Sequence, residues 1–330
     1  MKHRLRFAGK KLIRMALLIL GVSLAAFLLM SASPLDPLQS NVGQAALGSM
    51  SPEQIAKLEA YWGVGTPPLE RYLGWLTDFL HGDLGVSLLY RRPVVQIVGE
   101  RLGSSLWLMV TAWAVSGLLG LALGVAAGAC QGRLPDKLIR GYCLLISSTP
   151  VFWLALLLLM VFSVWLGALP IGLSVPIGMD AAAVGLADRL RHALLPALTL
   201  SITGVAGIAL HTREKMVQIM NSDYVLFARA RGESKGSIVL RHGLRNVALP
   251  ALTLQFASIS EIIGGSVLVE QVFSYPGLGQ AAVTAGLGSD LPLLLGITVV
   301  TSALVFGGNL AADLLYGVVD PKIRRGAAKT

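Results

Sequence analysis

Six long runs of mostly apolar residues constrain this chain more than any other feature. They lie at residues 12–31, 104–130, 144–169, 193–210, 247–272 and 291–319. Each run is about long enough for a helix to cross the roughly 30 Å of hydrocarbon in a bilayer. A helix also satisfies its own backbone hydrogen bonds, as hydrocarbon requires. The sequence therefore predicts an all-α integral membrane protein with six transmembrane helices.

Composition supports this class and argues against others. Of the 330 residues, 54% are hydrophobic and only 14% are charged, whereas soluble domains carry about 25% charged residues. The formal net charge of +9 could indicate nucleic acid in a soluble protein, but here the positive residues flank apolar runs, so we expect no nucleic-acid partner. Cys130 and Cys143 fit neither a metal spacing nor a disulfide framework, and we expect free thiols packed as small apolar groups.

The first apolar run has two interpretations. A basic start and a small-residue stretch at 31–33 resemble a secretory signal peptide. However, Pro34 would directly follow the cleavage site, and five more apolar runs come after it. We therefore expect a retained first helix.

The distribution of Lys and Arg predicts the orientation. If the N-terminus is cytoplasmic, the inside segments hold 20 of the 27 Lys and Arg residues, and five of the other seven lie in one long loop. Positive residues favour the cytoplasmic side, and long loops follow this rule only weakly. We expect a multi-pass protein with both termini cytoplasmic.

The order of the runs predicts three parts. Residues 1–103 form the first transmembrane helix and a long external loop, residues 104–320 form a five-helix core, and residues 321–330 form a basic cytoplasmic tail. The core includes a cytoplasmic loop at 211–246, the most basic one in the chain.

The external loop contains two predicted amphipathic helices. In the first, Ser51 is the N-cap, Pro52 the first helical residue, and Gln54 completes a capping box. The second starts at Thr66 and Pro67 and ends at Gly82. Its predicted apolar stripe comprises Leu69, Tyr72, Leu73, Leu76, Phe79 and Leu80.

The basic loop contains a predicted short helix, from Ser222 or Asp223 to Gly232. Ala228 and Gly232 are four residues apart and share a face with almost no side chain, which allows another surface to approach the backbone closely. Arg229 and Arg231 point elsewhere and can form salt bridges. The alternative is a solvated basic loop that only follows the positive-inside rule, with its arginines near anionic headgroups.

Glu261 lies in the middle of the fifth run, where a carboxylate is costly unless it faces water or a partner. We expect Glu261 to line or gate a path, and the alternative is a structural hydrogen bond to a neighbouring helix. Gly264 and Gly265 are expected to permit close helix contact or bending. Asp313 and Asn309, nearer the cytoplasmic end of the sixth run, are expected to be structural. Glu270 and the turn "YPGLG" are expected at the outer edge.

The sequence holds no recognisable catalytic set. There is no GxxxxGK[ST] phosphate-binding motif, so the chain is not expected to be an ATPase. No nucleophile and base fall together on convergent runs, and no two histidines within one run have a metal-ligand spacing. We predict no enzyme activity, no cofactor and no metal site in this chain.

The stretch "ARARGESKGSIVLRHGLRNVALP" at 228–250 resembles the cytoplasmic-loop signature of permease subunits in ATP-binding-cassette importers, in the oligopeptide, dipeptide and nickel branch. The matching residues are Ala228, Arg229, Ala230, Gly232, Arg241, His242, Leu244, Arg245, Asn246, Leu249 and Pro250. Other blocks similar to this branch are "GVSLAAFLL", "HGDLGVSL", "PVFWLALLL", "LLPALTL", "DYVLFARARG", "EIIGGSVLVEQVFSYPGLG" and "DLLYGVVDPKIR". Two departures are Leu226 and Phe227, where the wider signature has an acidic residue and an alanine, and "SPLDP", where the branch usually has Pro-Gly-Asp-Pro.

The resemblance implies the type I importer permease fold and a coupling helix that docks on a cytoplasmic ATPase. Ala228 and Gly232 would permit close docking, and Arg229 and Arg231 would form its polar rim. The implied partners are a homologous second permease subunit, two ATPase subunits that bind ATP and Mg, and an extracytoplasmic substrate-binding protein. Peptides or chelated nickel would cross the bacterial inner membrane by alternating access. The external helices would receive the binding protein, cap the outer mouth or lie in the interface.

Two other classes fit less well. A stand-alone secondary transporter or channel needs charged groups along its path, but the spans hold only two buried acids and no basic partner at matching depth. An intramembrane enzyme lacks a nucleophile or metal set. The sequence leaves the cargo open.

Overall fold

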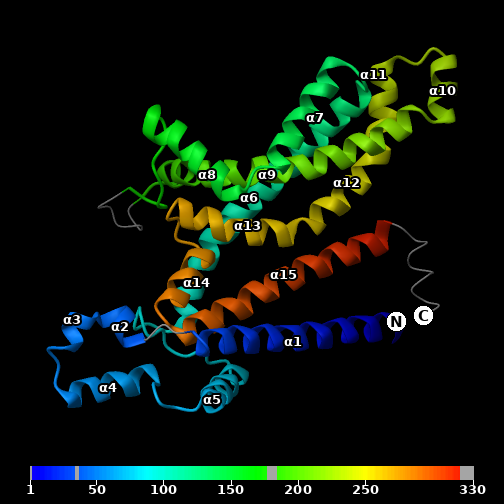
Figure 1. The fold of residues 1–330 in the computed structure, drawn as a ribbon. Coiled ribbons are helices and arrows are strands. Elements are labelled where there is room, and N and C mark those ends of the chain that lie inside the picture. The colour runs from blue at the N-terminus through cyan, green and yellow to red at the C-terminus, as the bar shows by residue number, and fades with distance from the viewer. Residues whose placement is uncertain (1, 34–36, 177–183, 320–330) are drawn as a thin grey trace. The chain divides into compact units, whose positions relative to one another are not determined.

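The computed structural model describes residues 2–33, 37–176 and 184–319 (Figure 1). The described residues are mainly helical, with one isolated antiparallel bridge between Val86 and Pro93. The all-α prediction is confirmed for this part of the chain. The predicted tail at 321–330 lies outside the described residues.

In chain order, the helices are α1 (Lys2–Ser31), α2 (Pro37–Val42), α3 (Gln44–Leu47), α4 (Pro52–Trp62), α5 (Pro68–Leu80), α6 (Val94–Ala129), α7 (Leu134–Ser147), α8 (Val151–Leu159), the π-helical η1 (Met160–Trp165), α9 (Leu186–Met220), α10 (Asp223–Ala230), α11 (Lys235–Ile238), the π-helical η2 (Val239–Leu244), α12 (Arg245–Ala257), α13 (Ile259–Val272), α14 (Leu278–Leu287) and α15 (Leu291–Val319).

Four of the described helices contain a segment long and apolar enough to cross a membrane: Ile13–Ser31, Val94–Ala129, Leu186–Met220 and Leu291–Asp313. Two further candidates are bent pairs. The pair Leu134–Ser147 and Val151–Trp165 bends by 104°, and the pair Lys235–Ala257 and Ile259–Val272 bends by 48°. The structure therefore has four to six candidate spans, and six only if each bent pair crosses once.

The third apolar run does not form the single straight helix that its length suggested. It breaks before Pro150, which takes extended backbone angles at the start of α8. Proline lacks a backbone N–H and disfavours helical geometry in the preceding residue, so the break is encoded locally. The 104° angle between the two helices is not encoded by the local sequence.

The chain forms two compact units, one of residues 1–105 with 276–306 and the other of residues 106–275 with 307–330. In the first unit, Phe27 of α1 and Tyr72 and Trp75 of α5 pack with Leu291 and Leu295 of α15. A second cluster joins the start of α6 to α14 and α15. The division at residue 103 stays a prediction.

The two external helices agree with the sequence to different degrees. The capping box of α4 is confirmed, because Gln54 N–H donates to Ser51 Oγ at 3.3 Å and Ser51 N–H donates to Gln54 Oε1 at 2.9 Å. The predicted start of α5 at Thr66 is wrong, since Pro67 is the N-cap and has no side-chain cap.

The predicted apolar stripe of α5 is only partly correct. Tyr72, Leu76 and Phe79 do pack inward, but so does Trp75, which the stripe omitted. The other three predicted members, Leu69, Leu73 and Leu80, are exposed. The helix packs along a line shifted toward Trp75 because the ring of Trp75 stacks on Phe79 and lies against Tyr72.

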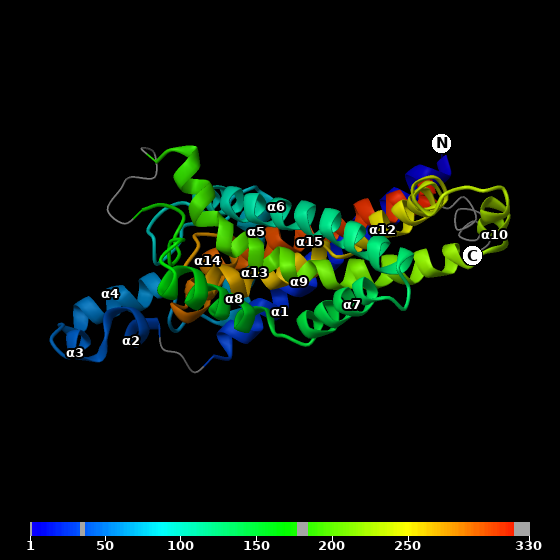
Figure 2. The same ribbon diagram turned by 90° about the horizontal axis from the view of Figure 1, so that it is seen from above.

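The second unit is organised around α9. A buried ion pair joins α7 to α9, because Arg213 donates to Asp136 through Nε at 2.5 Å and Nη2 at 2.7 Å. The N–H of Gly132 also donates to Asp136, at 2.9 Å. Figure 2 shows α7 alongside α9. This pairing fixes the end of α9 that leads into the basic loop.

Candidate coupling loop and membrane cavity

The basic loop contains the short helix that the sequence predicted, α10 (Asp223–Ala230), with Ser222 at its N-cap. Its end is a Schellman motif: Glu233 N–H donates to Ala228 O at 3.1 Å, and Gly232 N–H donates to Arg229 O at 2.9 Å. This motif needs a left-handed residue after the C-cap. Gly232 supplies it with φ of 81°, so glycine serves helix termination here.

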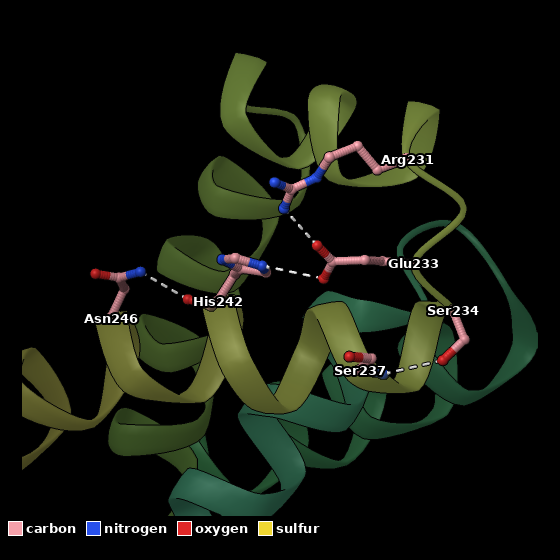
Figure 3. Close-up of polar contacts among 6 residues, drawn as sticks. All are labelled: Arg231, Glu233, Ser234, Ser237, His242 and Asn246. Atoms are coloured by element: carbon pink, nitrogen blue, oxygen red, sulfur yellow. Dashed lines mark hydrogen bonds and ion pairs between the residues drawn. The ribbon is translucent and has the colours of Figure 1, made fainter.

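Polar contacts tie the residues after α10 to the returning helices (Figure 3). Arg231 donates to Glu233 at 2.6 Å, and His242 Nε2 lies 3.3 Å from the other carboxylate oxygen of Glu233. The hydrogen bond from Arg231, followed by that from His242, lowers the pKa of the Glu233 carboxyl below its usual range. Glu233 is therefore a charged link between the end of α10 and η2 at neutral pH.

Two further contacts in Figure 3 continue this arrangement. Ser234 caps α11, since its Oγ accepts from Ser237 N–H at 3.3 Å. Asn246 Nδ2 donates to His242 O at 2.7 Å, one turn earlier in the same helical run. These contacts satisfy several polar groups of the loop within the loop itself.

An apolar cluster beneath the loop holds α10 in place. Val225 and Ala228 of α10 are buried with Met216 and Met220 of α9 and Ile238 of α11. Ala228 is only 1% exposed, so its methyl group packs against this chain. Gly232 lies just beyond the end of α10. The docking role of Ala228 and Gly232 stays a prediction.

The outer face of α10 is apolar and open. Tyr224 is 45% exposed, Leu226 64% and Phe227 69%. These residues were not predicted as a surface, and Leu226 and Phe227 stood out in the sequence only as departures from a signature. The sequence could show only that this short helix holds more large apolar residues than one buried face can accommodate. Which of them are exposed depends on tertiary packing.

The two predicted rim arginines differ in their partners. Arg231 forms the expected salt bridge, with Glu233. Arg229 is exposed, and its Nη2 donates to Met220 O at 3.3 Å, at the C-terminal end of α9. Arginine at a helix C-terminus interacts favourably with the last carbonyl groups. Both arginines thus form contacts within this chain, Arg229 with the end of α9 and Arg231 with the residues after α10.

The predicted path residues lie at the start of α13, just after the bend at Ser258. Glu261 and Gly265 line a cavity of about 230 Å³ within the second unit. Gly264 is exposed and does not line this cavity. The carbonyl of Gln255, one turn before the bend, accepts from Trp113 Nε1 at 2.7 Å and from Ser258 Oγ at 2.9 Å. Such partners compensate backbone groups at a helix bend.

Other predicted polar residues have clear positions. Asn309 Oδ1 accepts from Ser260 Oγ at 3.1 Å, which supports the structural role expected for Asn309. Glu270 is completely buried, near the end of α13, and its expected place at the outer edge stays a prediction. Cys130 and Cys143 are free, and Cys143 is buried. Among the residues that the structure describes, no group of three or more His, Cys, Asp or Glu side chains could hold a metal ion.

Comparison with known proteins places this arrangement in a family. Residues 120–325 match the model of the binding-protein-dependent transport system inner membrane component. The oligopeptide transport system permease protein AppB of Bacillus subtilis (strain 168) is 35% identical over 314 residues, covering 93% of this chain and 95% of that protein. The glutathione transport system permease protein GsiC of Salmonella typhimurium (strain LT2) is 34% identical over 322 residues, covering 97% and 99%.

A putative peptide transport system permease protein of Brucella abortus (strain 2308) is 35% identical over 303 residues, covering 92% of this chain and 94% of that protein. The chain belongs to the binding-protein-dependent transport system inner membrane component family, the membrane-spanning permeases of ATP-binding-cassette importers. The resemblance inferred from the loop and the other sequence blocks is thereby confirmed.

Proposed function

We propose that this chain is the permease subunit of an ATP-driven peptide importer in the bacterial inner membrane, and that α10 is its coupling helix. The family membership and the peptide-transport names of three relatives support the substrate class. One observation carries the assignment of α10: a rigidly held helix in a polar loop presents exposed Leu226 and Phe227. Exposed apolar groups of this kind are typical of a protein-protein contact.

The proposed contact is the cytoplasmic ATPase subunit. Leu226 and Phe227 would insert into a groove of that subunit, with Tyr224 beside them. Because the inner side of α10 packs on α9 and α11, a displacement of α10 would move these helices with it. Arg231 and Glu233 would keep the end of α10 attached to η2, which leads directly into α12. This route connects ATPase closure to the helices around the cavity.

The complete importer would contain this chain, a homologous second permease, two ATPases that bind ATP and Mg, and an extracytoplasmic binding protein. Alternating access would follow from the ATPase-driven movement. Both termini would be cytoplasmic, which places the basic loop on the ATPase side. The helices α4 and α5 would then lie outside, where they could meet the binding protein.

The test is reconstitution of this complex in liposomes with a di- or tripeptide, a longer peptide, glutathione or a nickel chelate presented with the binding protein. We expect ATP-dependent uptake of at least one peptide class, only when every subunit is present. Uptake of the nickel chelate alone would reassign the cargo. Solute movement by the purified chain without ATPases would overturn the importer assignment and favour a secondary transporter or channel.

A further inference from the structure

The cavity beside Glu261 has an unusual balance of hydrogen-bonding groups. Its wall is formed by the α7–α8 break, the middle of α9 and the start of α13. Besides Glu261, its polar side chains are Ser147, Thr149, Thr203 and Ser258. Among the described residues that line it there is no Lys, Arg or His. The wall therefore carries one carboxylate and four hydroxyl groups.

The hydroxyl protons are already used within the helices. Ser147 donates to Cys143 O and Thr149 donates to Leu145 O, both at 2.8 Å. Thr203 Oγ1 lies 3.0 Å from Leu200 O and 3.2 Å from Thr199 O, and Ser258 donates to Gln255 O at 2.9 Å. A hydroxyl has one proton and two acceptor lone pairs. With the protons engaged, these oxygens offer acceptors only.

Glu261 completes an acceptor-only wall. Its side chain is exposed in the first turn of α13, and among the described residues the structure gives its carboxylate no ion pair. An ionised carboxylate also accepts and does not donate. It belongs to one of the bent candidate spans, where an acidic side chain is costly unless a cation or water meets it.

A donor-rich cation matches this wall better than an anion or a divalent metal ion does. An ammonium group carries one positive charge and three donors with no acceptor. A ligand carboxylate would be repelled by Glu261 and would find no donor among the four hydroxyls. A divalent metal ion usually takes several carboxylate or imidazole ligands, and one carboxylate is too few.

The volume limits how much of a ligand this subsite can hold. About 230 Å³ is below the roughly 300–1,000 Å³ of pockets that enclose drug-sized ligands. It suits the charged end of a peptide or one side chain better than a whole oligopeptide. The rest of the cargo would then lie outside this cavity.

We propose that this cavity is a subsite for an ammonium group of the transported molecule, with Glu261 as its counter-ion and the four hydroxyl oxygens as additional acceptors. The ammonium comes from the α-amino group of a peptide or from a lysine side chain. This assignment rests on the proposed function for the identity of the cargo. The preference of the cavity for a positive charge follows from its lining residues and does not depend on that function.

The first experiment measures that charge preference without transport. In the assembled complex carrying Cys130→Ser and Cys143→Ala, Ser258→Cys is labelled with 2-aminoethyl or 2-sulfonatoethyl methanethiosulfonate. The cationic reagent should react faster, and Glu261→Gln should lower the cation-to-anion rate ratio by about tenfold, as expected for a charge-assisted contact. Ser49→Cys in the external loop is the control, and its ratio should not change.

Protection identifies the ligand group. Trialanine should slow labelling of Ser258→Cys, and N-acetyl-trialanine should not, if the α-ammonium binds. N-acetyl-Ala-Lys-Ala should protect instead if the subsite takes a lysine side chain, with N-acetyl-Ala-norleucine-Ala as its uncharged match. An unchanged rate ratio in Glu261→Gln would overturn the proposal, and so would equal protection by each ammonium-bearing peptide and its match without that ammonium group.

A transport measurement separates this proposal from the function on which it rests. In the reconstituted importer, Glu261→Gln should reduce uptake of the protecting peptide about tenfold more than uptake of its uncharged match. Thr203→Val, which removes one acceptor at similar shape, should have a smaller effect in the same direction. If no peptide is transported but the labelling ratio still depends on Glu261, the importer assignment fails while the cation preference holds.

Discussion

At the scale of single residues, Ala228 and Gly232 illustrate two different uses of a small side chain. Ala228 lies on the buried side of α10, where its small side chain allows the helix to pack close to α9 and α11. Gly232 is exposed, and a Cβ atom at that position would meet nothing within 4 Å. What requires glycine is the backbone, with φ of 81°. Residue size alone could not distinguish these two roles.

Replacing Gly232 should therefore weaken the end of α10 without a steric clash. A left-handed conformation costs a non-glycine residue about 1–2 kcal/mol, so Gly232→Ala should destabilise the Schellman motif by about 1 kcal/mol. Hydrogen exchange of the Glu233 amide, which donates to Ala228 O, measures this opening directly. The expected change is about fivefold faster exchange.

The matched control for this variant is Gly236→Ala in α11. Gly236 also has open space around its Cβ position, but its φ is not positive. Alanine favours a helix over glycine by up to about 1 kcal/mol, so exchange at Glu233 should stay the same or slow down. Equal acceleration by both variants would show that backbone conformation at Gly232 is not the cause.

Local sequence rules worked best where the determining contacts lie within a few residues. The capping box of Ser51 and Gln54 was predictable because the two partners are three residues apart. The same holds for the helix stop at Gly232. Glu233 and His242, nine residues apart, lie beyond such rules. Which face of α10 is buried depends on Met216 and Ile238, and therefore on tertiary packing.

At the scale of helices, α6 and α9 lie in close contact along a glycine seam, formed by Gly120, Gly124 and Gly128. A Cβ atom at these positions would lie 2.7, 2.5 and 2.5 Å from side-chain atoms of Ile208, Thr212 and Met216. Small residues at a spacing of four allow helix backbones to approach closely in a membrane. The seam was visible in the sequence as a spacing, but its partner helix was not.

The glycine seam predicts a large difference between two leucine substitutions. Gly124→Leu would place a side chain 2.7 Å from Ala209 O and 2.5 Å from Thr212 Cβ, so it should destabilise the protein by at least about 1–3 kcal/mol through overpacking. At Gly207, on α9, a Cβ atom would meet nothing within 4 Å, so Gly207→Leu should change stability by less than about 1 kcal/mol. Thermal unfolding of both variants in detergent, followed by fluorescence, measures the difference.

Neither substitution removes a polar group, so the difference between their unfolding temperatures measures the effect of packing. If Gly124→Leu and Gly207→Leu unfold at the same temperature as the unsubstituted protein, α6 and α9 are not held at the distance seen in the structure. If both unfold early, the space beside Gly207 is not open as the structure shows it.

At the scale of the whole molecule, the sequence predicted the class of protein better than its path through the membrane. Apolar run length predicts a helix, and Pro150 predicts a break, but the 104° and 48° bends depend on how α8 and α13 pack with α9. The cavity beside Glu261 could be suspected from one acid in an apolar run. Its hydroxyl wall could not, because residues 147, 203 and 258 are far apart in the sequence.

The transport function proposed for this chain depends above all on the outer face of α10 transmitting ATPase movement to the permease. ATP-dependent peptide uptake by the reconstituted complex carrying Phe227→Asp tests this role. Burying an unpaired carboxylate in an apolar contact is strongly unfavourable, so this variant should lose at least about 90% of uptake with no loss of thermal stability. Ser237→Asp, at the start of α11 in the same loop, adds an equal charge and should import normally. Uptake by Phe227→Asp equal to that of Ser237→Asp would show that this face does not couple the two subunits.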